Sequence, residues 1–179
     1  SRRQRQMCIR DRDMKALQLD LTSNFSKEIL PYILKNTGAF ENPIFKRAIK
    51  FLKDWNYIES IDSEGTLIFH SISNQIIQNV YYDELSVLGD KYFETFIGLK
   101  YITKRNLRNI LRNNTNKWVD DIRTPNKIET IDEIITKSIE SGIQKVIDNY
   151  GPNWSNWKWG SAHSLTHKHL SLIHISEPT

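Results

Sequence analysis

Hydrophobic residues recur at helical spacing along most of this chain, which predicts a mainly α-helical fold. Near the start they occur at every fourth position, and two further leucines widen the stripe: Leu17, Leu21, Phe25, Ile29, Ile33, Leu30 and Leu34. Because residues four apart share one side of an α-helix, this spacing predicts a single amphipathic helix that stops by Gly38. Asn42 and Pro43 form a typical helix start, and a second helix is expected from there to Trp55.

The middle of the chain predicts two more helical stretches. A turn is expected over residues 62–65, followed by a third helix that begins near Leu67 and ends near Tyr82. From Tyr92 to Leu111 the apolar spacing is less regular, which predicts a broken helical stretch.

The clearest stripe follows Thr130, where Thr130 and Glu133 fit a capping box. Its members are isoleucines and one valine at helical spacing: Ile131, Ile134, Ile135, Ile139, Ile143, Val146 and Ile147. Gly151 and Pro152 end this helix. Beyond it, alternation around Lys158 predicts a short strand-like segment between Trp157 and His169. The whole pattern predicts one helical unit.

Both ends of the chain look like translated adaptor DNA and not like native protein sequence. Residues 7–12 and 170–174 can be translated from one DNA string and its reverse complement, and the flanking residues resemble translated sequencing adaptors. We therefore expect residues 1–12 to be a disordered adaptor end, residues 170–179 to be a second one, and residues 13–169 to be the native segment of a longer gene.

This assignment changes the meaning of the charge. The formal net charge is +4 and the pI about 9.1. The two ends hold five arginines against two acidic residues, a net of +3, which leaves +1 for the native segment. A near-neutral segment gives no reason to expect a nucleic acid or a membrane as partner. Cys8, the single cysteine, lies in the first adaptor end, so no thiolate chemistry is expected from the native segment.

Three histidines near the end of the chain, His163, His167 and His169, raise the possibility of a metal site. No carboxylate or cysteine lies among them to complete a ligand set, which favours ordinary polar histidines over a metal centre.

Two further groups have a functional and a structural interpretation. The cations Lys100, Lys104, Arg108 and Arg112 form a helical stripe that suits a phosphate backbone or, as is more common, a solvated helix face opposite Tyr101, Leu107 and Leu111. The indoles of Trp154, Trp157 and Trp159 suit a stacking platform or, as we favour, a covered core.

No complete active site is recognisable from the residues alone. Asp20 with Ser23, and Asp120 with Asp121, are candidate nucleophile or acid–base pairs, but no histidine is near either pair in sequence. Glycine-rich phosphate loops are also missing. We therefore assign no catalytic, cofactor-binding or metal-binding residue.

The segment from Trp157 to His163, with His169 following, resembles the Trp-x-Trp-Gly-x-x-His…His-Pro-Leu pattern near the C-terminus of penicillin acylases. Leu170 replaces the proline, at the position where the second adaptor end begins. Other residues follow in the order expected for that family: Met14, Gln18, Asp20, Ser23, Leu30, Pro31, Trp55, Asp83, Glu84, Leu85, Trp118, Asp120, Asp121, Thr124, Glu129 and Thr130. The resemblance spans nearly all of residues 13–169.

The resemblance implies an N-terminal-nucleophile hydrolase in which a precursor cleaves itself and the new N-terminal serine of the larger, β chain attacks an amide carbonyl. This segment would be the helical C-terminal part of that β chain, packed beside an αββα catalytic core and inactive by itself. Gln18 and Asp20 would hydrogen-bond buried backbone.

The implied partners are the preceding part of the same precursor, meaning the α chain and the β-chain core, and a small N-acyl amide substrate. Penicillins and N-acyl homoserine lactones both suit that description. The serine, its oxyanion asparagine and the usual calcium ligands would precede this segment, and the protein would be periplasmic or secreted. The alternative is a helical interaction module without enzymatic activity.

Overall fold

The computed structural model describes residues 11–38, 40–113, 117–124 and 126–164, and its regular structure in these ranges is helical. In chain order the elements are α1 (Asp11–Gln18), α2 (Asn24–Lys35), α3 (Pro43–Asp54), α4 (Glu64–Val87), α5 (Asp90–Gly98), α6 (Lys100–Arg112), η2 (Lys117–Val119), α7 (Ile131–Tyr150), η3 (Trp154–Asn156) and α8 (Trp159–Ala162). The predicted mainly α-helical fold is confirmed.

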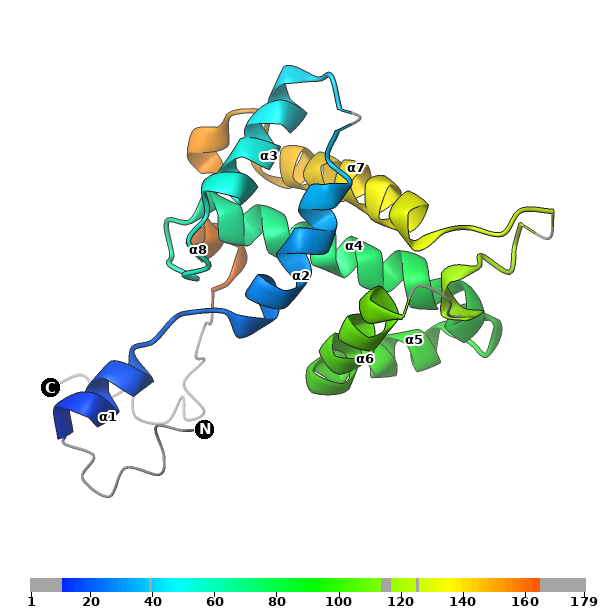
Figure 1. The fold of residues 1–179 in the computed structure, drawn as a ribbon, viewed down its shortest axis with the longest axis horizontal. Helices are drawn as coiled ribbons and strands as arrows, with labels where there is room; N and C mark the ends of the chain where they lie inside the picture. The colour runs from blue at the N-terminus through cyan, green and yellow to red at the C-terminus, as the bar shows by residue number, and fades with distance from the viewer. Residues whose placement is uncertain (1–10, 39, 114–116, 125, 165–179) are drawn as a thin grey trace, which may run out of the picture.

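The two longest helices, α4 and α7, lie side by side at the centre of the molecule (Figure 1). α4 is apolar on most sides, because α3, α5 and α7 all pack against it. Ile72 of α4 and Ile139 of α7 are fully buried. Within the described residues, no helix has the length and apolar character needed to cross a membrane.

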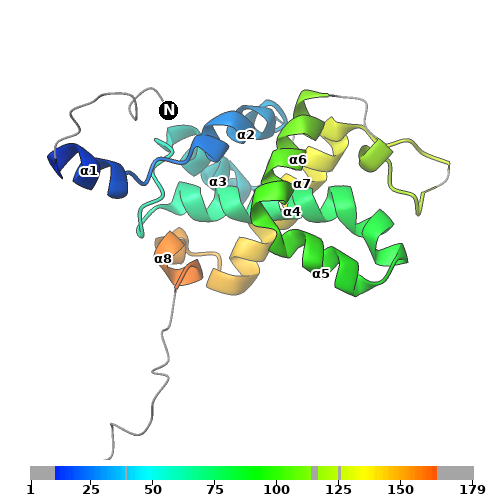
Figure 2. The same ribbon diagram turned by 90° about the horizontal axis from the view of Figure 1, so that it is seen from below.

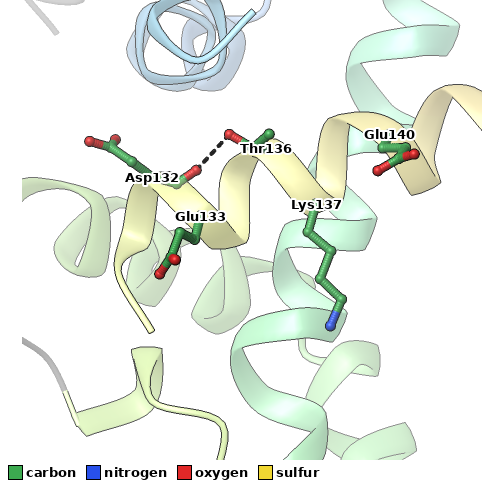
Figure 3. A pocket seen from close by; sticks show the side chains of 5 residues that line it. All are labelled: Asp132, Glu133, Thr136, Lys137 and Glu140. Atoms are coloured by element: carbon green, nitrogen blue, oxygen red, sulfur yellow. Dashed lines mark hydrogen bonds between the residues drawn. The ribbon is translucent and has the colours of Figure 1, made fainter. Parts of the chain in front are cut away.

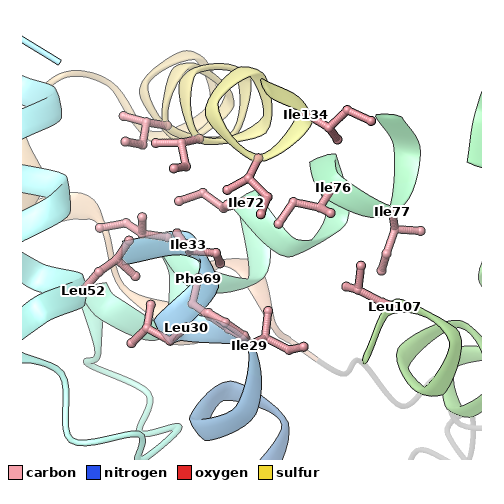
Figure 4. Packing of buried hydrophobic residues seen from close by; sticks show 14 of the residues in the cluster. Ile29, Leu30, Ile33, Leu52, Phe69, Ile72, Ile76, Ile77, Leu107 and Ile134 are labelled. Atoms are coloured by element: carbon pink, nitrogen blue, oxygen red, sulfur yellow. The ribbon is translucent and has the colours of Figure 1, made fainter. Parts of the chain in front are cut away.

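α2 and α3 cover the first half of α4 and complete the core there. Figure 4 shows Ile33, Leu52 and Phe69, from three different helices, pointing into one shared space. All three side chains are fully buried. Turned by 90°, the ribbon shows α5 and α6 beside the second half of α4 (Figure 2).

Side-chain caps fix where several helices begin. Asn42 accepts a hydrogen bond from the amide of Ile44 at 2.9 Å, with Pro43 in the first turn as expected. The predicted capping box is confirmed: Thr130 Oγ1 accepts from the amide of Glu133, and Glu133 Oε2 accepts from the amide of Thr130.

The single helix predicted across Leu17 and Leu34 is wrong, because the chain breaks into α1 and α2. Ser23 takes the N-cap position of α2 and accepts from the amide of Ser26 at 3.3 Å. Just before it, Thr22 forms an isolated antiparallel bridge with Ile58, in the linker between α3 and α4. The extended backbone of that bridge cannot continue a helix. Leu17 and Leu21 are exposed as a result.

The third helix ends at Val87, five residues beyond the predicted Tyr82. The strand-like segment predicted after Trp157 is also wrong where it is described, because residues 159–162 form the short helix α8. Residues 165–169 lie outside the described residues. The alternation around Lys158 has a different origin: Trp157 is fully buried in the core, and Trp159 stacks on the ring of His70.

Of the predicted adaptor end at residues 1–12, the structure describes the last two residues, which form the start of α1. Residues 170–179 lie outside the described ranges. The adaptor origin of both ends stays a prediction.

Candidate functional site

The tail after α7 returns to the main bundle and is anchored there by Trp157. Gly151 ends α7 with a φ of 79°, a backbone conformation that suits glycine, and the chain then passes through η3. Trp157 is fully buried, and its indole Nε1 donates to the carbonyl oxygen of Gly151 at 2.8 Å. The buried indole thus keeps its hydrogen bond, as a tryptophan in a core requires.

Trp159 is sandwiched between two imidazole rings. Its ring lies 4.5 Å from that of His70, with 18° between the planes, and 4.9 Å from that of His163, with 5° between the planes. His70 belongs to α4, so the stack fastens the tail to the central helix. We call these three residues the ring stack.

The tail also contacts the linker between α3 and α4, through Ile61 and Asp62. The amide of Gly160 donates to the carbonyl oxygen of Ile61 at 2.7 Å. A Cβ on Gly160 would lie 3.2 Å from that oxygen, so a larger residue would push the two segments apart. Lys158 forms an exposed ion pair with Asp62 at 3.0 Å. The glycine of the Trp-x-Trp-Gly pattern therefore lies in a close contact with Ile61.

Glu59 is the polar partner of the ring stack. Its Oε1 lies 2.9 Å from Nε2 of His70, with both side chains largely buried. Burial lowers the pKa of His70 below its ordinary value, and the carboxylate of Glu59 opposes this shift. Trp159 covers one face of the His70 ring, and Glu59 contacts a nitrogen at the edge of the same ring. The pair therefore serves best to orient His70 for stacking.

No sequence motif indicates that Glu59, His70 and Trp159 lie together. Glu59 and His70 lie on either side of the turn that starts α4, and Trp159 follows almost ninety positions later. Among the three indoles, the core interpretation is confirmed for Trp157, holds in part for half-buried Trp159, and is wrong for Trp154, which is 45% exposed.

The histidine metal site finds no support in the described part of the chain. No group of three or more His, Cys, Asp or Glu side chains there is arranged to hold a metal ion. His163 stacks on Trp159 instead. His167 and His169 lie outside the described residues.

A second polar cluster lies where the segment after α6 returns to the end of α4. The carboxylate of Asp83 is buried and accepts from the amide of Ile122 at 2.9 Å. Burial, with a hydrogen bond to Asp83, raises the pKa of Glu84 to about 8. Glu84 Oε2 is buried and receives no hydrogen bond from the residues that the structure describes, so the protonated acid suits this position, where it can donate to Asp83.

The candidate pair Asp120 and Asp121 is part of this cluster but does not act as an acid–base pair. Asp121 forms a two-bond ion pair with Arg123, both bonds 2.7 Å long, which lowers the pKa of Asp121 to about 2. Its amide donates to Glu129. Asp120 is half-buried, and its Oδ1 has no hydrogen-bond partner within the described residues. These contacts shape the loop before α7.

The other candidate pair, Asp20 and Ser23, also has local structural roles. Asp20 accepts from the amide of Thr22 at 3.0 Å, and Ser23 caps α2. The bond from Thr22 to Asp20 is exposed, as is Gln18, so the hydrogen bonds of Gln18 and Asp20 to buried backbone of the larger protein stay a prediction. The break between α1 and α2 removes both residues from the core-facing helix.

The basic stripe of α6 is divided between α2 and solvent, so the prediction of a solvated face holds for exposed Lys100 and Arg112 but not for Lys104 and Arg108. Lys104 and Arg108 lie over the ring of Phe25, at 4.9 and 5.4 Å from its centroid. Arg108 and Arg112 both approach the carboxylate of Glu28. Lys100 is exposed, as is Tyr101, which was expected to be on the apolar side.

An open depression lies on the outer face of α7. Figure 3 shows its lining side chains Asp132, Glu133, Thr136, Lys137 and Glu140, which spread apart instead of converging on one point. The hydroxyl of Thr136 is used within the helix, since it donates to the carbonyl oxygen of Asp132 at 2.8 Å. Nothing in this arrangement resembles a catalytic centre.

A comparison with protein families decides the affiliation of the chain. The family described as penicillin amidase matches residues 2–178. The chain belongs to the penicillin amidase family. No curated protein and no solved structure matches the chain. The penicillin amidase affiliation makes this an amide-hydrolase sequence, and the resemblance first seen around Trp159 is confirmed.

Proposed function

We propose that this chain is the helical C-terminal part of a hydrolase that removes the acyl group from N-acyl amides, with penicillins and N-acyl homoserine lactones as candidate substrates. The family match carries the proposal. The ring stack supports it, because the Trp-x-Trp-Gly-x-x-His pattern has a coherent structural purpose in attaching the tail to α4.

In this proposal the nucleophile is an N-terminal serine in a part of the protein that precedes the chain. The α-amine of that serine takes the hydroxyl proton as the oxygen attacks the amide carbonyl, and backbone and asparagine donors stabilise the oxyanion. The amine product leaves with a proton, and water then releases the acyl group as a carboxylic acid. The native segment by itself is expected to be inactive.

The role of the present chain is then to stabilise and cover the catalytic part. Its conspicuous polar residues support this role: Ser23 caps a helix, Asp121 pairs with Arg123, and Glu59 orients His70. The same family relationship leads us to propose that the protein is periplasmic or secreted and that any calcium is held by preceding residues.

The test is to recover the complete reading frame from the source DNA and to assay the purified product with a panel of N-acyl amides, detecting the released amine. We expect hydrolysis that is abolished when the serine at the self-cleavage junction is changed to alanine. A complete frame that has no such serine and whose product releases no amine would favour the helical interaction module.

A further inference from the structure

Two arginines of α6 line a small pocket against α2. Arg108 and Arg112 lie one turn apart on α6, and Glu28, Ile29 and Tyr32 of α2 form the opposite wall. The two helices pack against each other along this line. The pocket shares no residue with the ring stack or with the polar cluster of Asp83, Glu84 and Asp121.

Glu28 is shared between the two guanidinium groups and satisfies neither. Its Oε2 lies 2.7 Å from Nε of Arg108, yet this buried Nε makes no hydrogen bond of good geometry within the described part of the chain. The distance to Arg112 is 3.8 Å, beyond hydrogen-bond reach. One carboxylate thus faces two guanidinium groups without a well-aligned hydrogen bond to Nε of Arg108 and at a longer distance from Arg112.

The N–H groups of the two guanidinium groups suit one chemical class of ligand, the oxyanions. A guanidinium presents parallel N–H groups that match two oxygens of a carboxylate or a phosphate. Tyr32, which is half-buried on α2, lines the same pocket and carries a neutral hydroxyl that is able to donate. Lys104, one turn before Arg108, adds a further positive charge to the same side of α6.

We propose that Arg108, Arg112 and Tyr32 form a binding site for a small oxyanion, a carboxylate or a phosphate, and that the carboxylate of Glu28 occupies part of this site in the free protein. The ligand displaces Glu28 from the guanidinium groups and takes two-bond contacts that Glu28 cannot make from its own helix. Because Arg112 is largely exposed, binding is weak and depends on salt. The inference does not depend on the amidase activity.

The test is a titration of the full chain with sodium phosphate and, separately, sodium acetate at constant ionic strength, following the guanidinium Nε–H signals by NMR. We expect saturable shifts of the Arg108 and Arg112 signals. Stronger binding of phosphate would assign the site to phosphorylated ligands, and stronger binding of acetate would assign it to organic carboxylates.

Three variants make the test specific. Glu28→Gln removes the competing charge and should tighten binding about tenfold, whereas Arg112→Gln should weaken it at least about fivefold. Arg105→Gln is the matched control, because Arg105 is an exposed cation on the same helix. The proposal is overturned if neither anion gives a saturable shift, if Glu28→Gln binds no more tightly than the wild type, or if Arg105→Gln weakens binding as much as Arg112→Gln.

Discussion

Replacing Gly142 by alanine should destabilise the protein, although alanine is the better helix former. Gly142 lies in α7 where that helix meets α4. A Cβ at this position would be 2.8 Å from Cα and 3.0 Å from the amide nitrogen of Ile72, and 2.9 Å from its Cγ1. Two of these three atoms are backbone, which cannot move aside without shifting α4 itself.

The magnitude follows from two opposing effects. Alanine gains about 0.5 to 1 kcal/mol over glycine within a helix. Overpacking a close helix contact costs about 1 to 3 kcal/mol, and backbone atoms at the contact favour the upper part of that range. The hydrogen bond from Ser71 Oγ to the carbonyl oxygen of Gly142, 2.8 Å long, would also be strained. We expect a net loss of about 1 to 2 kcal/mol, which lowers the Tm by about 2 to 8 °C in a protein of this size.

Thermal and urea unfolding followed by circular dichroism measure this loss. Ser141→Ala is the matched control, since Ser141 is the neighbouring residue and its hydroxyl donates to carbonyl oxygens of α7 itself, those of Lys137 and Ser138. Its free energy of unfolding should stay within about 0.5 kcal/mol of the wild type. The close contact between α4 and α7 would be refuted by a Gly142→Ala variant as stable as the wild type or more so.

Three further predictions concern other parts of the fold. The protonated side chain of Glu84 should make the wild type less stable as the pH rises from about 4.5 to 8, because the native side chain keeps its proton up to about pH 8 while the unfolded chain releases it near 4.5. Urea unfolding at pH 5 and pH 8 should show that Glu84→Gln removes this loss of stability. A variant with the same dependence on pH as the wild type would count against a buried, protonated Glu84. Trp157→Phe loses the hydrogen bond to Gly151 and part of the buried ring, and should lower the free energy of unfolding by about 1 to 3 kcal/mol; a Tm equal to that of the wild type would show that the tail is not anchored there. Thr130→Ala removes the cap of α7 and should cost about 1 kcal/mol in urea unfolding, with Thr130→Ser close to the wild type; equal losses in both variants would argue against the capping box.

The sequence was sufficient to predict the helices that have strong local signals. The stripe after Thr130 and the start at Asn42 each combine a capping side chain with regular apolar spacing, and both helices form where expected. The same spacing was misleading at Leu21, because the bridge between Thr22 and Ile58 is a contact between distant segments that no local pattern contains. The strand predicted around Trp159 was wrong for a similar reason, since the conformation of this segment is set by the stacking of Trp159 on His70 of α4.

The contacts of the candidate site residues could not be predicted either, because they also join distant segments of the chain. The Trp-x-Trp-Gly-x-x-His pattern could be recognised as belonging to the penicillin amidases, but its structural purpose depends on His70 and Glu59, which have no sequence motif of their own. The basic stripe was visible, whereas its orientation toward Glu28 depends on how α6 is rotated against α2. Local spacing gives a helix its face, and packing decides what that face contacts.

The proposal that this chain has a structural and not a catalytic role is tested most directly by the activity of the intact amidase carrying His70→Gln. Because His70 holds the tail by stacking on Trp159 and has no place in the proposed chemistry, the Tm should fall while kcat stays within about twofold of the wild type. A kcat reduced about a hundredfold or more, at an unchanged Tm, is the effect of losing a general base. That result would place catalysis in this chain and contradict the account.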